Sequence, residues 1–391
     1  MKDRQGLWEK ALEVLNIITQ HGFEAFIIGG AVRDFHLRRR IHDVDIATSA
    51  SVDEMKTMFP KAKQLSKHFP TCLVIYQQEA FEVTTYRSEN KTLTADLLHR
   101  DFTMNAMAID RKTAIIDPFG GKTDIKQQII RSVEPAKRFK EDPLRMIRAV
   151  RFMAQLDFSI EPGTHECLLK HRPLLEQLPA ERVQAECGKL LMGDDHRDAL
   201  TYLFCCDIPA FFPKAIRPVS IHARKHSYNY DMQPLITAEE RWAAFLWLLY
   251  GKEAKQMPKK WRFSNRDKQK LIVILSFAEA YPETIPWNKQ LIYQTGLTLA
   301  LQVERLHQWL YDHTKKERFV YIQSVYRTLP ITSREELRIN GKDILATVPL
   351  IKKEKIGDVL RQLEHKVVEG SVKNDRQELV TFVKEKLHNE R

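Results

Sequence analysis

The feature that most constrains the fold is a loss of strand patterns near residue 136. Before this point, residues 26–28, 73–76 and 81–85 form apolar or alternating runs that predict short strands, and residues 7–21 have helical apolar spacing. After it, helical spacing dominates in residues 143–156, 181–192, 238–250, 267–280, 302–314 and 355–368. The sequence therefore predicts an α+β head, with a small mixed or antiparallel sheet and helices, followed by an all-α remainder.

Composition narrows the class of protein. The net charge of +11 and the pI near 9.3 fit a polyanionic partner, although a basic protein with no nucleic-acid role fits them equally well. The five cysteines include no CxxC pair, which argues against a disulfide scaffold and a structural zinc site. The N-terminus is too charged for a signal peptide, and the longest apolar run, residues 242–250, is about half of a membrane span. We expect a cytoplasmic protein that contacts no membrane.

Gly29 and Gly30 end the first predicted strand, at the point where a helix is expected to begin. Glycine lets backbone N–H groups approach a phosphate closely, and the N-terminus of a helix favours an anion. Arg33 follows within one helical turn and could add a charge-assisted contact. A plain tight turn is the simpler explanation of the two glycines taken alone.

Asp43, Val44 and Asp45 form a second feature. In a strand, residues i and i+2 point to the same face, so the two carboxylates would converge. Carboxylates this close repel each other, and a divalent cation is their natural partner. Glu82, in an alternating strand, could supply a third carboxylate. A solvated acidic turn is the alternative for the tripeptide taken alone.

The two features in this order are more specific than either alone. Two glycines, twelve intervening residues and then Asp-x-Asp resemble the catalytic signature of the polymerase-β-like nucleotidyltransferases. The resemblance implies that Asp43 and Asp45 hold two Mg²⁺ ions, that Glu82 assists them, and that the glycine turn with Arg33 binds the nucleotide. Such ions would activate a 3′-hydroxyl and neutralise the triphosphate as pyrophosphate leaves.

The segment HRDFTMNA at residues 99–106 is the third feature. It begins like a kinase catalytic loop, but Asn105 comes one residue too early and no glycine-rich loop with a strand lysine precedes it. It instead resembles the RDxTxNA motif of tRNA nucleotidyltransferases and bacterial poly(A) polymerases, although relatives often have Arg in place of His99. The resemblance implies that Arg100, Asp101 and Asn105 contact the sugar and phosphates of the nucleotide. An Arg/Asp pair can select a ribonucleotide because a 2′-hydroxyl is both donor and acceptor.

Residues 141–152, EDPLRMIRAVRF, carry an acid and three arginines at intervals of three, which form one slowly drifting strip on a helix. A capped helix with a basic, solvated side is the alternative explanation. The segment resembles the EDxxR motif of class II tRNA nucleotidyltransferases, which implies that Asp142 and Arg145 act as an amino-acid template. It also implies that Glu141 positions Arg145, and that Arg148 and Arg151 bind the triphosphate or orient the template.

Hydrogen bonding explains why such a template would select cytosine. Ionised Asp142 only accepts and Arg145 only donates, whereas cytosine offers its N4 donor beside its N3 acceptor. Adenine fits with some adjustment. Guanine and uracil present a carbonyl to the carboxylate and an N–H to the guanidinium, at a cost of roughly 1–3 kcal/mol for each unpaired buried group.

The resemblance extends over residues 20–200 and implies a seahorse-shaped molecule of four parts. These are a nucleotidyltransferase head at 1–135, a neck with the templating helix at 136–205, a body at 206–315 and a tail at 316–391. Residues 337–345 resemble the tail entry of bacterial class II enzymes, whose body and tail bind the elbow and acceptor stem of tRNA. Scattered basic residues suffice for such phosphate contacts, although a solvated face explains each one alone. The candidates are Lys259, Lys260, Arg262, Arg266, Lys268, Lys352, Lys353, Lys355, Lys366 and Lys373.

The segment at residues 88–99, between Arg87 and Arg100, indicates the subclass. Complete CCA-adding relatives carry a longer flexible segment here, which is thought to reshape the pocket for ATP after two cytidines. The short segment implies an enzyme that adds CC from CTP with Mg²⁺ and leaves the terminal A to a separate A-adding enzyme. The alternatives are a complete CCA-adding enzyme that uses CTP and ATP, a poly(A) polymerase, and a non-catalytic RNA-binding protein. Intact Asp43, Asp45 and Arg145 argue against the last of these.

Overall fold

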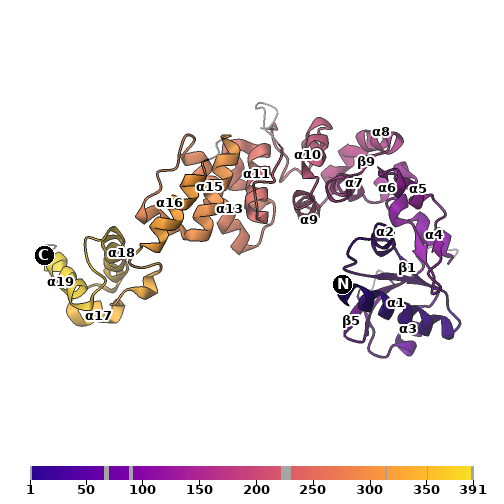
Figure 1. The fold of residues 1–391 in the computed structure, drawn as a ribbon, viewed down its shortest axis with the longest axis horizontal. Coiled ribbons are helices and arrows are strands. Elements are labelled where there is room, and N and C mark those ends of the chain that lie inside the picture. Colours follow the sequence, from indigo (N-terminus) through magenta and orange to yellow (C-terminus); the bar gives the residue numbers. More distant parts are fainter. Residues whose placement is uncertain are drawn as a thin grey trace. The chain divides into compact units, whose positions relative to one another are not determined.

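The computed structural model describes residues 2–65, 70–87, 91–221, 230–312, 315–349 and 351–388. It divides into two compact units, Met1–Val219 and Ser220–Arg391 (Figure 1). Within these described ranges the strands all belong to the first unit and the second unit is helical, which confirms the predicted α+β class. No helix in the described parts of the chain is both long and apolar enough to cross a bilayer.

A seven-stranded sheet forms the centre of the head, in the order β3-β4-β5-β2-β1-β6-β7. The β2/β5 pair is parallel and the other pairs are antiparallel, so the sheet is mixed, as predicted. The strands are β1 (Ala25–Ile28), β2 (Asp45–Thr48), β3 (Lys63–Gln64), β4 (Thr71–Tyr76), β5 (Glu79–Thr85), β6 (Ala108–Ile109) and β7 (Ile115–Ile116). The three strands predicted from the sequence correspond to β1, β4 and β5.

Helices pack around this sheet and carry residues of the predicted motifs. Helix α1 (Lys2–Gln20) packs on β1 because Ala11, Val14, Leu15 and Ile18 recur at helical spacing and are fully buried. Helix α2 follows β1 directly, and α4 ends just before His99. The remaining elements of the head are α2 (Gly30–His36), α3 (Val52–Met58), α4 (Leu93–Leu98), η1 (Thr103–Asn105) and α5 (Gly121–Lys126).

Five further α-helices complete the described part of the first unit, together with a small second sheet. Helix α7 packs on α9 and α10 through a face that includes the buried side chains of Met146, Ile147 and Val150. The parallel pair β8 (Ile129–Ile130) and β9 (Ser159–Ile160) joins the chain before α6 to the chain after α7. The helices are α6 (Pro135–Glu141), α7 (Leu144–Leu156), α8 (Pro162–His171), α9 (Ala180–Leu191) and α10 (His196–Cys205), with η2 (Arg172–Gln177) and η3 (Ile208–Phe211). The predicted boundary at residue 135 falls between β8 and β9, and the four-part division remains a proposal.

The second unit is built from helices around two groups of buried side chains. Trp242, Phe245 and Trp261 pack edge to face in the first group, and Ile344, Leu363 and Val367 belong to the second. The helices are α11 (Ala238–Tyr250), η5 (Gly251–Gln256), α12 (Met257–Lys260), α13 (Asn265–Ala280), α14 (Lys289–Thr295), α15 (Leu297–Leu310), α16 (Lys316–Arg327), η6 (Arg334–Glu336), α17 (Gly341–Thr347), α18 (Lys353–Glu369) and α19 (Arg376–His388).

The sequence prediction was wrong about where one helix of this unit begins and ends. The apolar spacing predicted a helix over 302–314, whereas α15 runs from Leu297 to Leu310. The chain enters α15 through Gly296, whose φ of 74° lies in the region that favours glycine. That glycine, rather than the apolar pattern, fixes where the helix starts.

Candidate functional site

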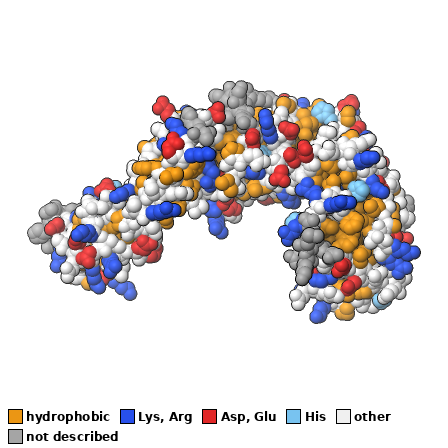
Figure 2. Space-filling view, viewed as in Figure 1, with side chains coloured by type: hydrophobic (Ala, Val, Ile, Leu, Met, Phe, Trp, Pro, Cys, Tyr) orange, Lys and Arg blue, Asp and Glu red, His pale blue; other side chains and the backbone are white. Residues whose placement is uncertain are grey.

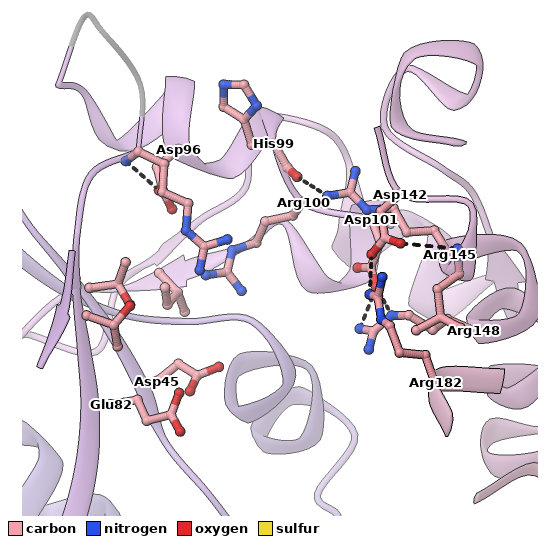
Figure 3. A pocket seen from close by; sticks show the side chains of 15 residues that line it. Asp45, Glu82, Asp96, His99, Arg100, Asp101, Asp142, Arg145, Arg148 and Arg182 are labelled. Atoms are coloured by element: carbon pink, nitrogen blue, oxygen red, sulfur yellow. Dashed lines mark hydrogen bonds and ion pairs between the residues drawn. The ribbon is translucent and has the colours of Figure 1, made fainter. Parts of the chain in front are cut away.

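A cavity of about 260 Å³ lies in the first unit, between strands β2 and β5 of the head sheet and the start of α7 (Figure 3). Strands β2 and β5 supply acidic side chains, the chain after α4 supplies the residues of the RDxTxNA motif, and α7 and α9 supply arginines. The lining residues are Ile28, Asp45, Thr71, Glu82, Thr84, Arg87, Asp96, His99, Arg100, Asp101, Asp142, Leu144, Arg145, Arg148 and Arg182. The third and fourth sequence motifs therefore meet at one cavity with the second.

Asp45 and Glu82 form the acidic side of the cavity. They are direct neighbours in the parallel pairing of β2 with β5, and Figure 3 shows their carboxylates side by side. Burial raises the pKa of Asp45, and the charges of Asp43 and Glu82 raise it further. Negative charge is therefore concentrated where β2 and β5 line the cavity.

Asp43 does not belong to that strand. Because β2 begins at Asp45, the strand alternation expected to align the two carboxylates does not apply, and Asp43 is an exposed residue of the preceding loop. Among the residues that the structure describes, no group of three His, Cys, Asp or Glu side chains is arranged to hold a metal ion. The acidic side therefore consists of the carboxylates of Asp45 and Glu82, and the charge of Asp43 also raises the pKa of Asp45.

Arg100 lies beside this acidic pair as a buried cation. Its Nε is buried and has no hydrogen-bond partner within the described ranges, and burial lowers the pKa of its guanidinium. The nearby charges of Asp96 and Asp45 act in the opposite direction on that pKa. A buried donor without a partner costs about 1–3 kcal/mol, so this N–H is available to a polar or anionic group that enters the cavity.

Gly29 makes room for this guanidinium. Its φ is 74°, and a Cβ at this position would lie 2.5 Å from Nη1 of Arg100 and 3.8 Å from Oδ2 of Asp45. The backbone N–H of Gly29 donates to the carbonyl of Met107 at 3.4 Å. The glycine turn therefore admits an arginine to the cavity, whereas neither Gly29 nor Gly30 lines it.

A chain of hydrogen bonds runs from α2 to α7 behind the cavity. Arg33 donates from Nη1 to Oδ1 of Asn105 at 2.7 Å and from its other nitrogens to Asp34. Asn105 donates to Oδ1 of Asp101 at 2.9 Å, and Arg148 donates to Oδ2 of Asp101 at 2.6 and 2.8 Å. Burial would raise the pKa of Asp101, but the charge of Arg148 and these hydrogen bonds hold it below its ordinary value. Asp101 therefore attaches the head to α7.

The proposed template residues lie at the start of α7. Asp142 accepts from the backbone N–H of Leu144 at 3.2 Å and from Nη2 of Arg182 at 3.0 Å. Arg145 donates from Nη2 to the carbonyl of His99 at 3.0 Å, and its Nη1 lies 3.6 Å from Oε2 of Glu141. Asp142 and Arg145 line the same cavity without forming a hydrogen bond or ion pair with each other, at least in the described structure. Each is held by other residues.

The structure brings half of the predicted site residues to the lining of the cavity, and the other half do not line it. Those that line it are Asp45, Glu82, Arg100, Asp101, Asp142, Arg145 and Arg148. Those that do not are Gly29, Gly30, Arg33, Asp43, Asn105, Glu141 and Arg151. Arg151 is buried against the ring of Phe152 at 4.0 Å and lies 2.8 Å from Glu186, and burial lowers its pKa to about 10.

Sequence reasoning missed Arg87, Asp96, Arg138 and Arg182. Asp96 accepts from the backbone N–H of Arg87 at 3.2 Å, a contact between residues nine positions apart that no spacing predicts. Arg182 and Glu186 are four residues apart on α9 and so share one face of the helix, which is the only sequence signal that either carries. That face is turned toward α7, where Arg182 meets Asp142 and Glu186 meets Arg151.

Family models match the chain in three consecutive regions. The poly(A) polymerase head domain matches residues 25–131, an RNA and SrmB-binding site of polymerase A matches 157–215, and tRNA nucleotidyltransferase domain 2 matches 233–383. With the cavity described above, these matches define a nucleotidyltransferase.

Relatives that match nearly the full length of the chain show which nucleotidyltransferases it resembles. The chain is 34% identical to a CCA-adding enzyme of Geobacillus thermodenitrificans, and the match covers 97% of each chain. It is 33% identical to a CC-adding tRNA nucleotidyltransferase of Halalkalibacterium halodurans, over 97% of this chain and 98% of the relative. The crystal structure of the Bacillus stearothermophilus CCA-adding enzyme in complex with CTP matches with a TM-score of 0.85 at 33% identity, covering 98% of both chains. The chain belongs to the tRNA nucleotidyltransferases that include the CCA-adding and CC-adding enzymes, which confirms the predicted family.

Proposed function

We propose that this tRNA nucleotidyltransferase adds two cytidines from CTP to the tRNA 3′ end and leaves the terminal adenosine to a separate enzyme. The observation that carries the proposal is the short connection between the acidic strand and the RDxTxNA motif. Strand β5 ends at Thr85 and α4 begins at Leu93. Residues 88–90 of this connection lie outside the described part of the chain. So short a connection has no length for the lever that the complete CCA-adding relatives are thought to use.

The lengths of the alignments support the same subclass. The match to the CC-adding relative spans 378 positions for 97% of the 391 residues of this chain, so nearly every aligned position holds a residue of this chain. The match to the Geobacillus thermodenitrificans CCA-adding enzyme covers the same 97% over 394 positions, about 15 more. A difference of this size is what one missing segment would produce.

The start of α7 would select the nucleotide. Asp142 presents only acceptors and Arg145 only donors to the cavity, and these match the N4 and N3 edge of cytosine. Arg182 would hold the carboxylate of Asp142, and Arg148 would hold α7 against Asp101. Arg100, with its unpaired buried donor, would contact the sugar or phosphates of the nucleotide.

The acidic side of the cavity suits a divalent cation. Asp45 and Glu82 offer adjacent carboxylate oxygens, the ligands that Mg²⁺ prefers. Burial, followed by the charges of Asp43 and Glu82, raises the pKa of Asp45, and a bound cation would favour its ionised form. We assign Asp43 and Asp45 as the Mg²⁺ ligands, with Glu82 assisting. The metal would activate the 3′-hydroxyl and neutralise the charge of the leaving pyrophosphate.

The second unit would bind the tRNA through scattered cations. On the face seen in Figure 2, Lys and Arg are interspersed with Asp and Glu along this unit. Lys366 and Lys373 lie 3.5 and 3.9 Å from Glu369 and Glu378, so part of their charge is offset within the tail. Contacts of this kind to a duplex backbone weaken steeply with salt.

A product-length assay tests the subclass. A tRNA lacking CCA is incubated with CTP alone, ATP alone and both, and a tRNA ending in CC is incubated with ATP as the control. We expect two added nucleotides with CTP, none with ATP and no third with both. Efficient addition of A after CC would make the chain a complete CCA-adding enzyme. Long A tracts on generic RNA would instead indicate a poly(A) polymerase.

A further inference from the structure

Arg138 is a fully buried arginine in α6 that belongs to none of the motifs described above. Its side chain is 0% exposed, and it is among the largest fully buried side chains of the described chain. Nη1 lies 2.9 Å from Nδ1 of His99, and Nη2 donates to Oε1 of Glu141 at 2.8 Å. Its Nε is buried and has no hydrogen-bond partner within the described ranges. An apolar side chain could fill this space without such a cost, which points to a role beyond packing.

Four contacts close a ring that includes one of the proposed template residues. Arg138 contacts the imidazole of His99, and the backbone carbonyl of His99 accepts from Arg145 at 3.0 Å. Nη1 of Arg145 lies 3.6 Å from Glu141, and Glu141 accepts a hydrogen bond from Arg138, which closes the ring. The ring joins the chain after α4 to α6 and α7, and His99 and Arg145 also line the cavity. The guanidinium of Arg145 is therefore positioned by its neighbours and not by Asp142.

The contact with Arg138 fixes the protonation of His99. A guanidinium has only donors, so Nδ1 of His99 must accept and must carry no proton. His99 is then neutral, with its proton on Nε2. A side chain at position 99 can make this contact only if it presents an acceptor to Arg138.

Glu141 is shared between two arginines, and the sharing is unequal. Oε1 lies 2.8 Å from Arg138, whereas Oε2 is 3.6 Å from Arg145. If Arg138 were absent, the full charge of Glu141 would act on Arg145. A tighter ion pair would then turn the guanidinium toward α6 and away from the base edge.

We propose that Arg138, acting through neutral His99 and Glu141, is a positioning residue that holds Arg145 in the orientation that distinguishes cytosine from uracil. The proposal rests on the template role given to Arg145 under the proposed function. According to this proposal, the preference for CTP over UTP depends on Arg138, a buried residue that does not line the cavity.

The test measures kcat/KM of the full chain for CTP and for UTP on a tRNA lacking CCA. Arg138→Met and His99→Leu should each lower the CTP-to-UTP ratio by about tenfold to a hundredfold, as a displaced contact group does. His99→Asn, which keeps an acceptor, should retain most of the ratio. The double variant Arg138→Met/Glu141→Gln should have a higher ratio than Arg138→Met alone, because the charge of Glu141 that would pull on Arg145 is gone. Arg131→Met, which removes an ion-paired arginine away from the cavity, is the matched control.

The outcomes separate this inference from the proposed function. If Arg145→Ala leaves the CTP-to-UTP ratio unchanged, the template role fails and the inference fails with it. If Arg145→Ala lowers the ratio while Arg138→Met and His99→Leu keep the wild-type value, only the positioning role is overturned. Thermal unfolding shows whether Arg138→Met folds, and His99→Leu decides the question if it does not.

Discussion

The two sides of the cavity treat charge in opposite ways. On the α7 side each charged group has an internal partner: Asp101 binds Arg148, Asp142 binds Arg182 and Arg151 lies against Glu186. On the sheet side, Asp45 and Glu82 lie side by side with no ion pair to a basic group in the described structure, and Nε of Arg100 has no partner there. The α7 side is organised by its own contacts, whereas the sheet side leaves these groups available to a ligand in the described structure.

Asp45→Ala is the strongest test of that contrast. If the acidic side exists to hold metal, cytidine addition should fall by at least about 10³-fold, as when a group essential to chemistry is removed. Binding of tRNA, measured by gel shift, should survive because the carboxylate is assigned to the metal and not to the RNA. Asp53→Ala removes an exposed acid of α3 and should change neither quantity. Loss of tRNA binding in Asp45→Ala would contradict the assignment.

Arg100→Met tests the unpaired cation. Its removal should lower kcat/KM for CTP by roughly 10²-fold, because a preorganised donor is lost from the site. The free energy of unfolding should stay the same or rise, since a buried donor without a partner is also removed. Urea unfolding of the two proteins checks this, and a marked loss of stability would show that Arg100 has a structural partner.

Asp101→Asn tests the paired side, where stability should suffer. Removing one partner of a buried pair should cost about 2 kcal/mol of unfolding free energy at neutral pH. Because the folded-state pKa of Asp101 lies below its ordinary value of 3.8, its contribution is fully present above pH 3.8. It is lost as pH falls through the lower, folded-state pKa. Unfolding curves of both proteins should therefore converge only in strong acid, and a constant difference across that range would refute the ion pair.

Asp142→Ala tests whether the same paired side also carries specificity. The CTP-over-UTP preference should fall by about tenfold, since one buried hydrogen-bonding group is removed from the base edge. Binding of the triphosphate, followed through the KM for CTP, should change less. Arg182→Ala is an informative companion, because it releases Asp142 without removing it. A preference unchanged in Asp142→Ala would exclude the carboxylate from the template.

The sequence predicted which motifs meet at this site better than it predicted the contacts that their side chains make with other residues of the protein. Local patterns located β1, β4, β5 and α7, and the residues Asp45, Glu82, Arg100, Asp142 and Arg145 meet at the cavity that these elements form. Patterns of this kind depend on neighbours within a turn or a strand, which is the range over which sequence spacing carries information.

The contacts that were not predicted join residues far apart in the chain. Arg138 and His99 are 39 positions apart, and Arg182 and Asp142 are 40 apart. Arg33 was expected to bind the nucleotide, and Arg151 to bind the triphosphate or orient the template. Their internal partners Asn105 and Glu186 were not predicted, because only tertiary packing brings them there. A charged residue's partner is set by the fold, and spacing alone does not give it.

The short parallel pairing of β8 with β9 limits where the chain can be divided into fragments or exchanged domains. Backbone N–H groups of Ser159 and Glu161 donate to the carbonyls of Gln128 and Ile130 at 3.0 and 3.1 Å, so α6 and α7 lie within a loop closed at its base. A fragment that ended at residue 135 would lose this closure and the Arg148 contact to Asp101 together. Domain exchange between family members should therefore place its junction beyond residue 161, so that the donor's sheet is transplanted as one module with α6 and α7.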